Sequence, residues 1–431
     1  MADTPFQVID ISHLKPGMFI ELELGWMAHP FPTSSFKITS TKQIQTIRSL
    51  GLHQVRVNLG KSDAPETSDT QACPEPARTQ ATPTVPDPAR SAALVQSRLN
   101  KELLNAQQRD LLNCERRYTQ TMRQYKQVVD QVHTHPAQMK QQCQEVVQGF
   151  VTDILNAGDT AIRLLSDGMG DKVAMHPVNV CVLCLLLGKY MGLSATEMDD
   201  LGMAAFLHDI GKAQLPDRVR WLEEHFSAHE QKLYQEHVEF GRMLATRMAL
   251  SPSAIQAIEQ HHEMVDGSGF PRHLLGDAMP RAAKILALVN RYDGLCNPTR
   301  ATAALTPHEA IALIFAHLKP RFDPVVVASF IRMMGVYPPG SIVQMVDQRY
   351  AMVVSVNAER PLKPRVIVFD PKVSKHEALI LNLESSPELG IRRSLKPASL
   401  PKAAMDYLSP RQRICYFFER AVTLPVEDTT P

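Results

Sequence analysis

The stretch Phe206-Leu207-His208-Asp209-Ile210-Gly211-Lys212 lies near the middle of a chain of 431 residues. It places a histidine beside an aspartate, with a lysine four positions after the histidine. If the segment is helical, His208 and Lys212 share one face, and Asp209 lies about 100° around the helix axis from His208. One helical turn can therefore direct an imidazole, a carboxylate and an ammonium group toward a common point.

The composition is that of an ordinary globular protein. Apolar residues make up 44% of the chain and charged residues 21%, and the formal net charge is +1. This balance gives no indication of a nucleic-acid partner or of a membrane surface. The N-terminus has no signal-peptide pattern, and no apolar run approaches the roughly 18 residues of a membrane span. We therefore expect a cytoplasmic protein.

The seven cysteines are scattered along the chain and form no disulfide framework. Cys181 and Cys184 have the C-x-x-C spacing of redox motifs, but they fall in an apolar helical run over residues 180–187. Since no strand-turn-helix pattern surrounds them, the sequence favours buried packing over a redox role.

The pattern of the chain predicts a mainly α protein with small β-containing parts at both ends. Short alternating runs and one helical run predict an α+β module at the N-terminus, and a proline-rich stretch after it predicts a disordered linker. We expect the region 160–334 to be entirely helical. The predicted segments are an N-terminal β-rich module (1–60), a linker (61–91), a helical strut or coil (92–137), a large helical domain (138–336), a small β appendix (337–385) and a polar tail (386–431).

Clear start signals mark the helices of the large domain. Serine or threonine followed three positions later by glutamate is a capping box, in which the two side chains satisfy the first free amides of a helix. A cap residue before proline is a second signal, because proline suits the first helical position. These signals occur at Ser194, Ser227, Ser251, Thr306 and Asp323.

Further histidines lie at the apolar edges of other predicted helices: His176, His237 and the pair His261-His262. Asn290 ends another apolar run. A single histidine on an apolar face is more often a hydrogen-bonded core residue than a ligand, but burying this many imidazoles without a shared partner would be costly. Neutral imidazole and carboxylate are standard ligands of divalent transition metals, so the residue types predict a metal site.

In order and spacing, these residues and the loop Asp-Gly-Ser-Gly-Phe-Pro at 266–271 resemble the HD-GYP family, a subgroup of the HD metal-dependent phosphohydrolases. The resemblance covers about residues 140–335. Residues 14–18, Leu-Lys-Pro-Gly-Met, are similar to part of a domain of unknown function often joined to this family. The resemblance implies a helical domain that holds two or three metal ions, commonly iron or manganese, and hydrolyses the bacterial second messenger cyclic di-GMP to pGpG or GMP.

The resemblance also implies a role for individual residues. Asp209 would bridge two ions, and Lys212 would contact the substrate phosphate or a metal-bound water, so these two are the expected catalytic residues. A hydroxide between two ions about 3.5–4 Å apart would be the nucleophile. The implied metal ligands are His176, His208, Asp209, His237, His261, His262 and, where the family has aspartate, Asn290. The implied substrate-binding residues are Lys212, Gly267, Gly269, Phe270, Pro271 and Arg300.

Two departures from the family pattern concern the metals. Asn290 offers an amide oxygen but no negative charge, so one ion should bind more weakly. Lys172 stands where members with a third metal have a glutamate, so we expect two divalent ions.

The other departures concern the substrate. Thr299 and Thr302 stand where the family has an arginine and a second basic residue that grip the phosphates, although Arg300 is close by. Phe270 replaces the tyrosine of the family motif and loses only a hydroxyl. The glycines of the 266–271 loop let backbone approach a ligand closely, but they also suit a plain turn after a helix.

Three functions stay open on the sequence. The first is an active two-metal cyclic di-GMP phosphodiesterase. The second is a degenerate module that binds cyclic di-GMP or another signalling protein without turnover, which Asn290 and the missing arginine favour. The third is a phosphohydrolase for another nucleotide, which the intact 266–271 loop disfavours. We expect no nucleic-acid partner, and the helix over 92–133 is compatible with a homodimer.

Overall fold

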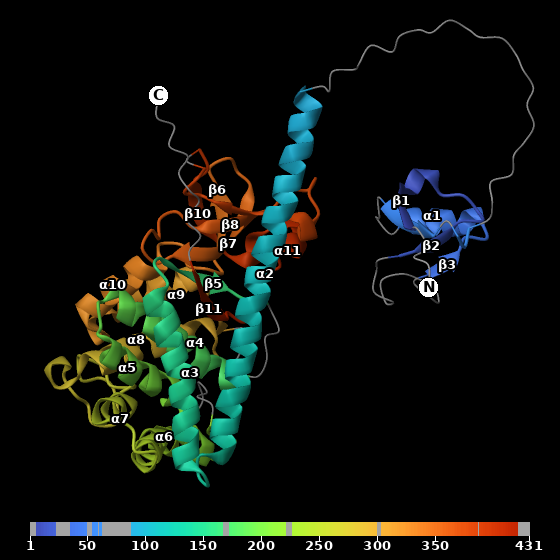
Figure 1. Ribbon diagram of the computed structural model, residues 1–431. Helices are drawn as coiled ribbons and strands as arrows, with labels where there is room; N and C mark the ends of the chain where they lie inside the picture. Colours follow the sequence, from blue (N-terminus) through green and yellow to red (C-terminus); the bar gives the residue numbers. More distant parts are fainter. Residues whose placement is uncertain are drawn as a thin grey trace, which may run out of the picture. The chain divides into compact units, whose positions relative to one another are not determined.

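The computed structural model divides the chain into two compact units, Met1–Val85 and Pro86–Pro431 (Figure 1). Each unit is described by itself. The structure describes residues 6–22, 35–49, 54–58, 60–62, 88–166, 172–220, 226–299, 303–386 and 388–420.

The first unit is a small antiparallel sheet with one helix, which confirms the predicted α+β module. Its strand order is β1-β4-β2-β3, and its core contains Ile20, Ile47 and Val57. The third strand was not predicted, because three residues are too few to show an alternating pattern. The elements are β1 (Phe6–Asp10), β2 (Phe19–Glu21), β3 (Ser35–Lys37), α1 (Thr41–Ser49) and β4 (Gln54–Asn58).

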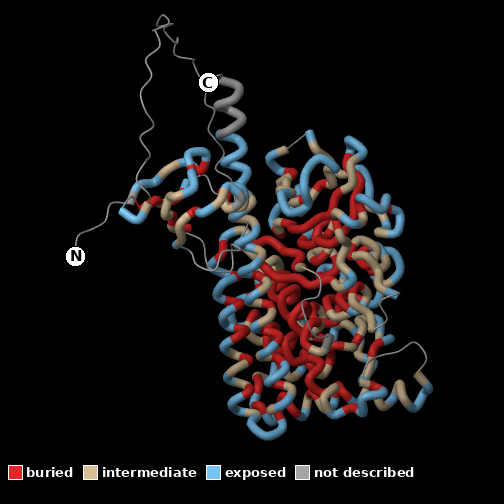
Figure 2. The backbone as a smooth tube through the Cα atoms, turned by 90° about the vertical axis from the view of Figure 1, so that its right-hand side faces the viewer, coloured by how far each residue is buried: buried red, intermediate tan, exposed pale blue. Residues whose placement is uncertain are grey.

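The second unit begins with two long helices, α2 (Pro88–Gln131) and α3 (Pro136–Asn156), which run side by side (Figure 1). α2 starts inside the segment predicted as a linker, with a proline in its first turn, where proline is tolerated. Its C-terminal half packs on the domain through buried Tyr118 and Tyr125, whereas Leu99 and Leu103 in the N-terminal half are exposed (Figure 2).

Among the described residues, seven shorter helices complete the helical part, and their first residues confirm the predicted start signals. Ser194, Ser227 and Thr306 each form a capping box, and Ser251 and Asp323 each cap a helix that opens with proline. The helices are α4 (Lys172–Tyr190), α5 (Ala195–Leu207), α6 (Ala228–Arg247), α7 (Pro252–Glu259), α8 (Arg281–Cys296), α9 (Pro307–Leu313) and α10 (Pro324–Met334). Short 3₁₀ turns lie at Ile11–His13, Ile210–Gln214, Gly276–Ala278, Lys319–Arg321, Lys375–Glu377 and Pro397–Ser399, and a π turn at Ile314–Leu318.

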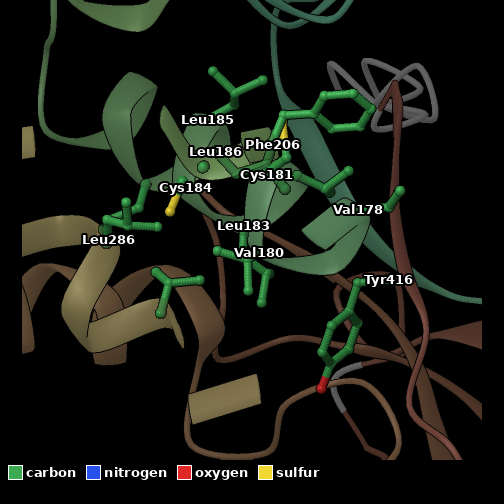
Figure 3. Close-up of a cluster of buried hydrophobic side chains, with 14 of the residues drawn as sticks. Val178, Val180, Cys181, Leu183, Cys184, Leu185, Leu186, Phe206, Leu286 and Tyr416 are labelled. Carbon is green, nitrogen blue, oxygen red and sulfur yellow. The ribbon is translucent and has the colours of Figure 1, made fainter. Parts of the chain in front are cut away.

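Helix α4 is the central element of the core. Its side chains from Val178 to Leu187 are buried, and they meet Phe206 and Leu286 from neighbouring helices (Figure 3). Within the described residues, its stretch Val173–Tyr190 is long and apolar enough to cross a membrane, contrary to the expectation from the sequence, but 78% of it is buried in the protein. Cys181 and Cys184 are fully buried in this core, and burial raises the pKa of both thiols, which confirms packing for this pair.

An antiparallel seven-stranded sheet lies at one end of the helical part (Figure 1). It corrects two predictions. β5 lies at the start of the region expected to be entirely helical, and the segment 386–431, expected to be a tail, supplies β10, α11 and β11. β11 pairs with β5, so a strand that precedes α4 and the last described strand lie side by side in this sheet. The elements are β5 (Thr160–Leu164), β6 (Ile342–Met345), β7 (Tyr350–Asn357), β8 (Arg365–Val368), β9 (Ile380–Asn382), β10 (Ile391–Leu395), α11 (Lys402–Leu408) and β11 (Tyr416–Arg420).

Candidate metal centre

The six histidine and aspartate side chains expected to bind metal come together from four parts of the helical domain. Their ligand atoms form two groups, and within each group the atoms lie within 4.8 Å of one another. Asp209 belongs to both groups, as a bridging ligand would. One group is His176, His208 and Asp209, and the other is Asp209, His237, His261 and His262.

The backbone fixes the proton positions of three of these histidines. In each, Nδ1 contacts the carbonyl oxygen of the residue three positions earlier. A carbonyl oxygen only accepts, so Nδ1 carries the proton and donates it, and Nε2 of the neutral ring is left as an acceptor. The pairs are His208 with Ala205, His237 with Tyr234 and His261 with Ile258.

The acceptors on His237 and His261 face each other, and the acceptor on His208 faces Nε2 of His176. Nε2 of His208 lies 3.2 Å from Nε2 of His176, and Nε2 of His237 lies 3.3 Å from Nε2 of His261. Two lone pairs at this separation repel unless a cation lies between them. Oδ1 of Asp209 and Nε2 of His262 are also buried without a hydrogen-bond partner among the described residues. The donor set therefore fits divalent metal ions, because each of these atoms lacks a positive partner.

Burial keeps three of the imidazoles neutral. Burial, assisted by the charge of Lys212, lowers the pKa of His237 to about 4. Burial and the neighbouring imidazoles hold the pKa of His261 and of His262 well below the ordinary value. Burial would also lower the pKa of His176, but the hydrogen bond and charge of Asp293, together with Asp209, raise it above the ordinary value.

Asp293 is a residue of the candidate centre that the sequence pattern did not predict. Its Oδ2 lies 2.6 Å from Nδ1 of His176, and its side chain is fully buried. Its Oδ1 accepts hydrogen bonds from Asn179 and Asn297, at 2.9 and 3.0 Å. A carboxylate in this position fixes the ring of a ligand histidine and directs Nε2 at the metal. The available signal was the spacing, since Asp293 follows Asn290 by three positions and shares its helix face.

Asn290 contacts His176, the same histidine that Asp293 orients. Its Oδ1 is 3.0 Å from Nε2 of His176. With the proton of His176 on Nδ1, both atoms are acceptors, and a cation would join them. Turning the amide would instead place its NH₂ group on Nε2 and satisfy His176 without metal. An aspartate has no such alternative, so this geometry supports weaker metal binding at this position.

Asp209 and Lys212 form a buried ion pair. Nζ of Lys212 lies 2.7 Å from Oδ2 of Asp209 and also lies over the ring of Tyr234. Burial would raise the pKa of Asp209, but Lys212, with His208 and His176, holds it well below the ordinary value. Burial would lower the pKa of Lys212, but Asp209 raises it above the ordinary value. The pair therefore stays ionised, with Oδ1 of Asp209 left for a metal.

The comparison with family models decides the family. The model of the HD domain matches residues 98–326, which is just over half of the chain. The chain belongs to the HD domain family. A second model, described as a domain of unknown function (DUF3391), matches residues 7–143. Together with the relatives below, these matches confirm the predicted resemblance and the predicted fold class.

Several known proteins are similar to this chain. Cyclic di-GMP phosphodiesterase PA4108 of Pseudomonas aeruginosa is 27% identical over 85% of this chain and 86% of its own length. The cyclic di-GMP phosphodiesterase response regulator RpfG of Xanthomonas campestris is 33% identical over 34% of this chain and 39% of its own length. Among solved structures, Bd1817, an HDG"Y"P protein from Bdellovibrio bacteriovorus, is 13% identical over 76% of this chain and 98% of its own, with a TM-score of 0.43.

Glu263 holds the loop that follows the predicted metal ligands His261 and His262. Its side chain is fully buried directly after His261 and His262. Its two oxygens accept hydrogen bonds from the backbone amides of Arg272 and Leu274, at 2.6 and 2.9 Å. Glu263 is therefore a positioning residue, because both of its oxygens are used to fold the loop back on the helix end.

The 266–271 loop packs directly on His262, one of the predicted metal ligands. The ring of Phe270 stacks on the ring of His262, with centroids 4.5 Å apart. Gly269 permits this approach, since an added Cβ would lie 2.5 Å from the carbonyl oxygen of His262. Gly267 has a φ of 77°, as a turn requires, and a cis peptide joins Phe270 to Pro271. A substrate contact for these four residues remains a prediction.

The remaining predicted residues lie at or next to segments outside the described residues. Arg300 and Thr302 fall outside the described residues, and so does the side chain of Lys172. The carbonyl oxygens of Pro298 and Thr299 accept hydrogen bonds from Arg413, at 2.6 and 3.4 Å. The segment expected to be a tail therefore contacts the loop on which the family carries its phosphate-gripping arginine.

Proposed function

We propose that this protein is a metal-dependent phosphodiesterase that hydrolyses cyclic di-GMP to a linear product, pGpG or GMP. The observation that carries the proposal is the set of inward-facing Nε2 atoms, each on a histidine whose Nδ1 is held by a fixed acceptor, around the unpaired oxygen of Asp209. The substrate is inferred from the relatives, since PA4108 and RpfG are named as cyclic di-GMP phosphodiesterases.

Two ions would be held by the two groups of side chains. His176, His208 and Asp209, with the amide oxygen of Asn290, would hold one ion. Asp209, His237, His261 and His262 would hold the other. When bound, such ions supply an activated water as nucleophile and positive charge against the phosphodiester.

The residues of the chain prepare this site in three ways. Asp293 keeps the proton of His176 on Nδ1, so Nε2 stays available as a ligand. Burial and neighbouring charge keep the pKa of His237 low, so its imidazole is neutral at physiological pH. Lys212 stays protonated beside Asp209, where its charge would stabilise the additional negative charge on the phosphate in the transition state.

A second function is favoured by one observation. Asn290 brings no charge to the site, and its amide could satisfy His176 without metal. The protein would then bind cyclic di-GMP or a signalling partner without turnover.

Metal analysis coupled to a hydrolysis assay separates these functions. We expect purified protein loaded with Fe²⁺ or Mn²⁺ to retain about two ions per chain, one for each group, and to convert cyclic di-GMP to a linear product that chromatography resolves. Asp209→Asn, which removes the shared ligand charge, should lose both metal and turnover. Two retained ions without turnover would favour the binding module. If the protein retains no metal, the proposal of a metal-dependent phosphodiesterase is wrong.

A further inference from the structure

A small cavity adjoins the metal centre. Its volume is about 50 Å³, and its lining includes His176, Asp209, Lys212 and Arg220. The first three belong to the centre described above. Arg220 is the additional residue, and it lies on the segment that follows the 3₁₀ turn Ile210–Gln214.

The guanidinium of Arg220 has unused hydrogen-bonding capacity. Its Nε is buried and has no acceptor among the residues that the structure describes. One of its other nitrogens, Nη2, donates to the carbonyl oxygen of Leu215 at 3.2 Å and pairs with Asp217 at 2.9 Å. The side chain of Asp217 is 91% exposed, so water screens this pair. A buried N–H group without an acceptor is costly, and a ligand oxygen would satisfy it.

The charges around the cavity favour an anion. Lys212 and Asp209 neutralise each other across 2.7 Å. Arg220 adds a positive charge whose carboxylate partner lies in solvent. Tyr125 and Val129 of α2 form part of the apolar wall, which limits water and strengthens the interaction of a charge with its partner. A guanidinium in such a place suits phosphate oxygens, because its planar N–H groups match their geometry.

We propose that Arg220 binds a phosphate of the phosphodiester substrate and takes the place of the basic residues that this chain lacks at Thr299 and Thr302. The inference rests on the proposed function, since it names a substrate contact of the same site. It assigns the contact to a loop between α5 and α6, on the side of the centre lined by α2. Arg220 contributes to affinity for the phosphate, and the metal ligands carry the chemistry.

The test compares Arg220→Gln with Arg218→Gln. Arg218 is a matched control, because it lies two positions away, is 84% exposed and pairs with Glu230. In metal-loaded protein we expect Arg220→Gln to raise KM for cyclic di-GMP by roughly ten- to hundredfold, the loss of a charged hydrogen bond, with kcat little changed. Its KM should also depend less on salt than that of wild type. Arg218→Gln should behave as wild type.

Arg220→Lys keeps the proposal testable if Arg220→Gln does not fold. Lysine preserves the charge but removes the planar fork, so KM should rise by less than in Arg220→Gln and kcat should stay near wild type. Metal content and melting temperature of each variant, compared with Arg218→Gln, report a structural effect. A KM in Arg220→Lys equal to that of wild type would overturn the proposal, and so would equal KM values in the two glutamine variants.

Equilibrium binding of cyclic di-GMP separates this inference from the proposed function. If metal-loaded wild type binds cyclic di-GMP without turnover and Arg220→Gln weakens binding roughly tenfold or more, the phosphate contact is supported and the proposed phosphodiesterase activity is wrong. If wild type hydrolyses cyclic di-GMP and both glutamine variants bind it as tightly as wild type, the proposed activity is supported and the phosphate contact is wrong. If wild type neither binds nor hydrolyses cyclic di-GMP, both are wrong.

Discussion

Asp293 lies with Oδ2 at 2.6 Å from Nδ1 of His176, and this contact links the metal centre to the core of the domain. The same carboxylate accepts from Asn179, which lies on α4 with His176. Asn179 in turn accepts from the backbone amide of Tyr416 at 3.1 Å. Strand β11 is therefore joined through two side chains, those of Asn179 and Asp293, to His176, a predicted metal ligand.

The first prediction concerns Asp293→Asn. An amide is neutral and holds the imidazole proton of His176 less strongly, so Nε2 becomes a poorer and less well oriented ligand. We expect metal affinity to fall roughly ten- to hundredfold, as for other residues that orient ligand histidines. Metal retained per chain across a series of chelator concentrations measures the change.

Tyr118→Phe is the matched control for this prediction. The Tyr118 hydroxyl donates to Asn179 at 3.0 Å, so it belongs to the same buried network but does not contact His176. Its loss should lower the free energy of unfolding by about 1 kcal/mol and leave metal affinity unchanged. Equal metal retention in Asp293→Asn and wild type would show that the contact is only structural.

The second prediction concerns Asn290→Asp. An aspartate adds a charged ligand beside His176 and removes the amide that could occupy Nε2. We expect metal affinity to rise by roughly tenfold, or about 1.4 kcal/mol. In metal-free protein the added carboxylate is close to other buried groups and should lower stability. Relative to wild type, the melting temperature of this variant should therefore rise in the presence of Mn²⁺ and fall in its absence. A metal content equal to that of wild type would show that position 290 is not a ligand.

The third prediction concerns the spacing between two ligand-bearing elements. An added Cβ at Gly211 would lie 2.0 Å from the carbonyl oxygen of His237 and 2.4 Å from the amide of Gly241. Gly211→Ala should therefore force the turn after Asp209 away from α6. We expect a loss of about 1–3 kcal/mol in stability, typical of overpacking, together with a loss of bound metal.

Gly241→Ala is the control on the opposite side of this contact. Its added Cβ would meet Ile258 at 3.4 Å, an ordinary separation, and alanine is favoured over glycine within a helix. We expect this variant to keep its metal and to be at least as stable as wild type. If Gly211→Ala also keeps both metal and stability, the close approach of the turn after Asp209 to α6 does not determine the geometry of the metal site.

The sequence predicted those parts of the fold that depend on local signals. The capping boxes at Ser194, Ser227 and Thr306 act within four residues, so they mark helix starts without tertiary information. β5 gave no such signal, because all five of its residues are buried and the strand shows no alternation. Its partner β11 lies some 250 residues later, and no local pattern can report a pairing at that distance.

The site follows the same division. Histidines at the apolar edges of separate helices predicted the donor set, because that many buried imidazoles need a shared partner. Asp293 was missed because an acidic residue late in a helix is typical of a solvated face. Its spacing from Asn290 places it on the same helix face, but its burial and its contact with His176 show its role. Arg220 was missed because its cavity depends on packing between α2, α4 and the turn after Asp209.

The last prediction concerns acid stability of the metal-free protein. The pKa of His237 is lowered from the ordinary 6.5 to about 4 in the folded chain. Between these values the unfolded chain binds a proton that the folded chain does not, so the free energy of unfolding falls as pH falls. For His237 the slope is about 1.4 kcal/mol per pH unit, and His261 and His262 act in the same direction.

His176 acts in the opposite direction, since its pKa is raised in the folded chain. Its stabilising contribution is fully present below the ordinary pKa and is lost as pH rises through the folded value. Folding lowers the pKa of three imidazoles and raises the pKa of one. We therefore expect protein stripped of metal by a chelator to be less stable at about pH 5 than at about pH 7.5 in denaturant unfolding. His237→Gln should reduce the slope of the free energy of unfolding against pH by up to the contribution of one proton, about 1.4 kcal/mol per pH unit. A flat profile in wild type would mean that these imidazoles are solvated in the metal-free protein, and that the buried cluster forms only when metal binds.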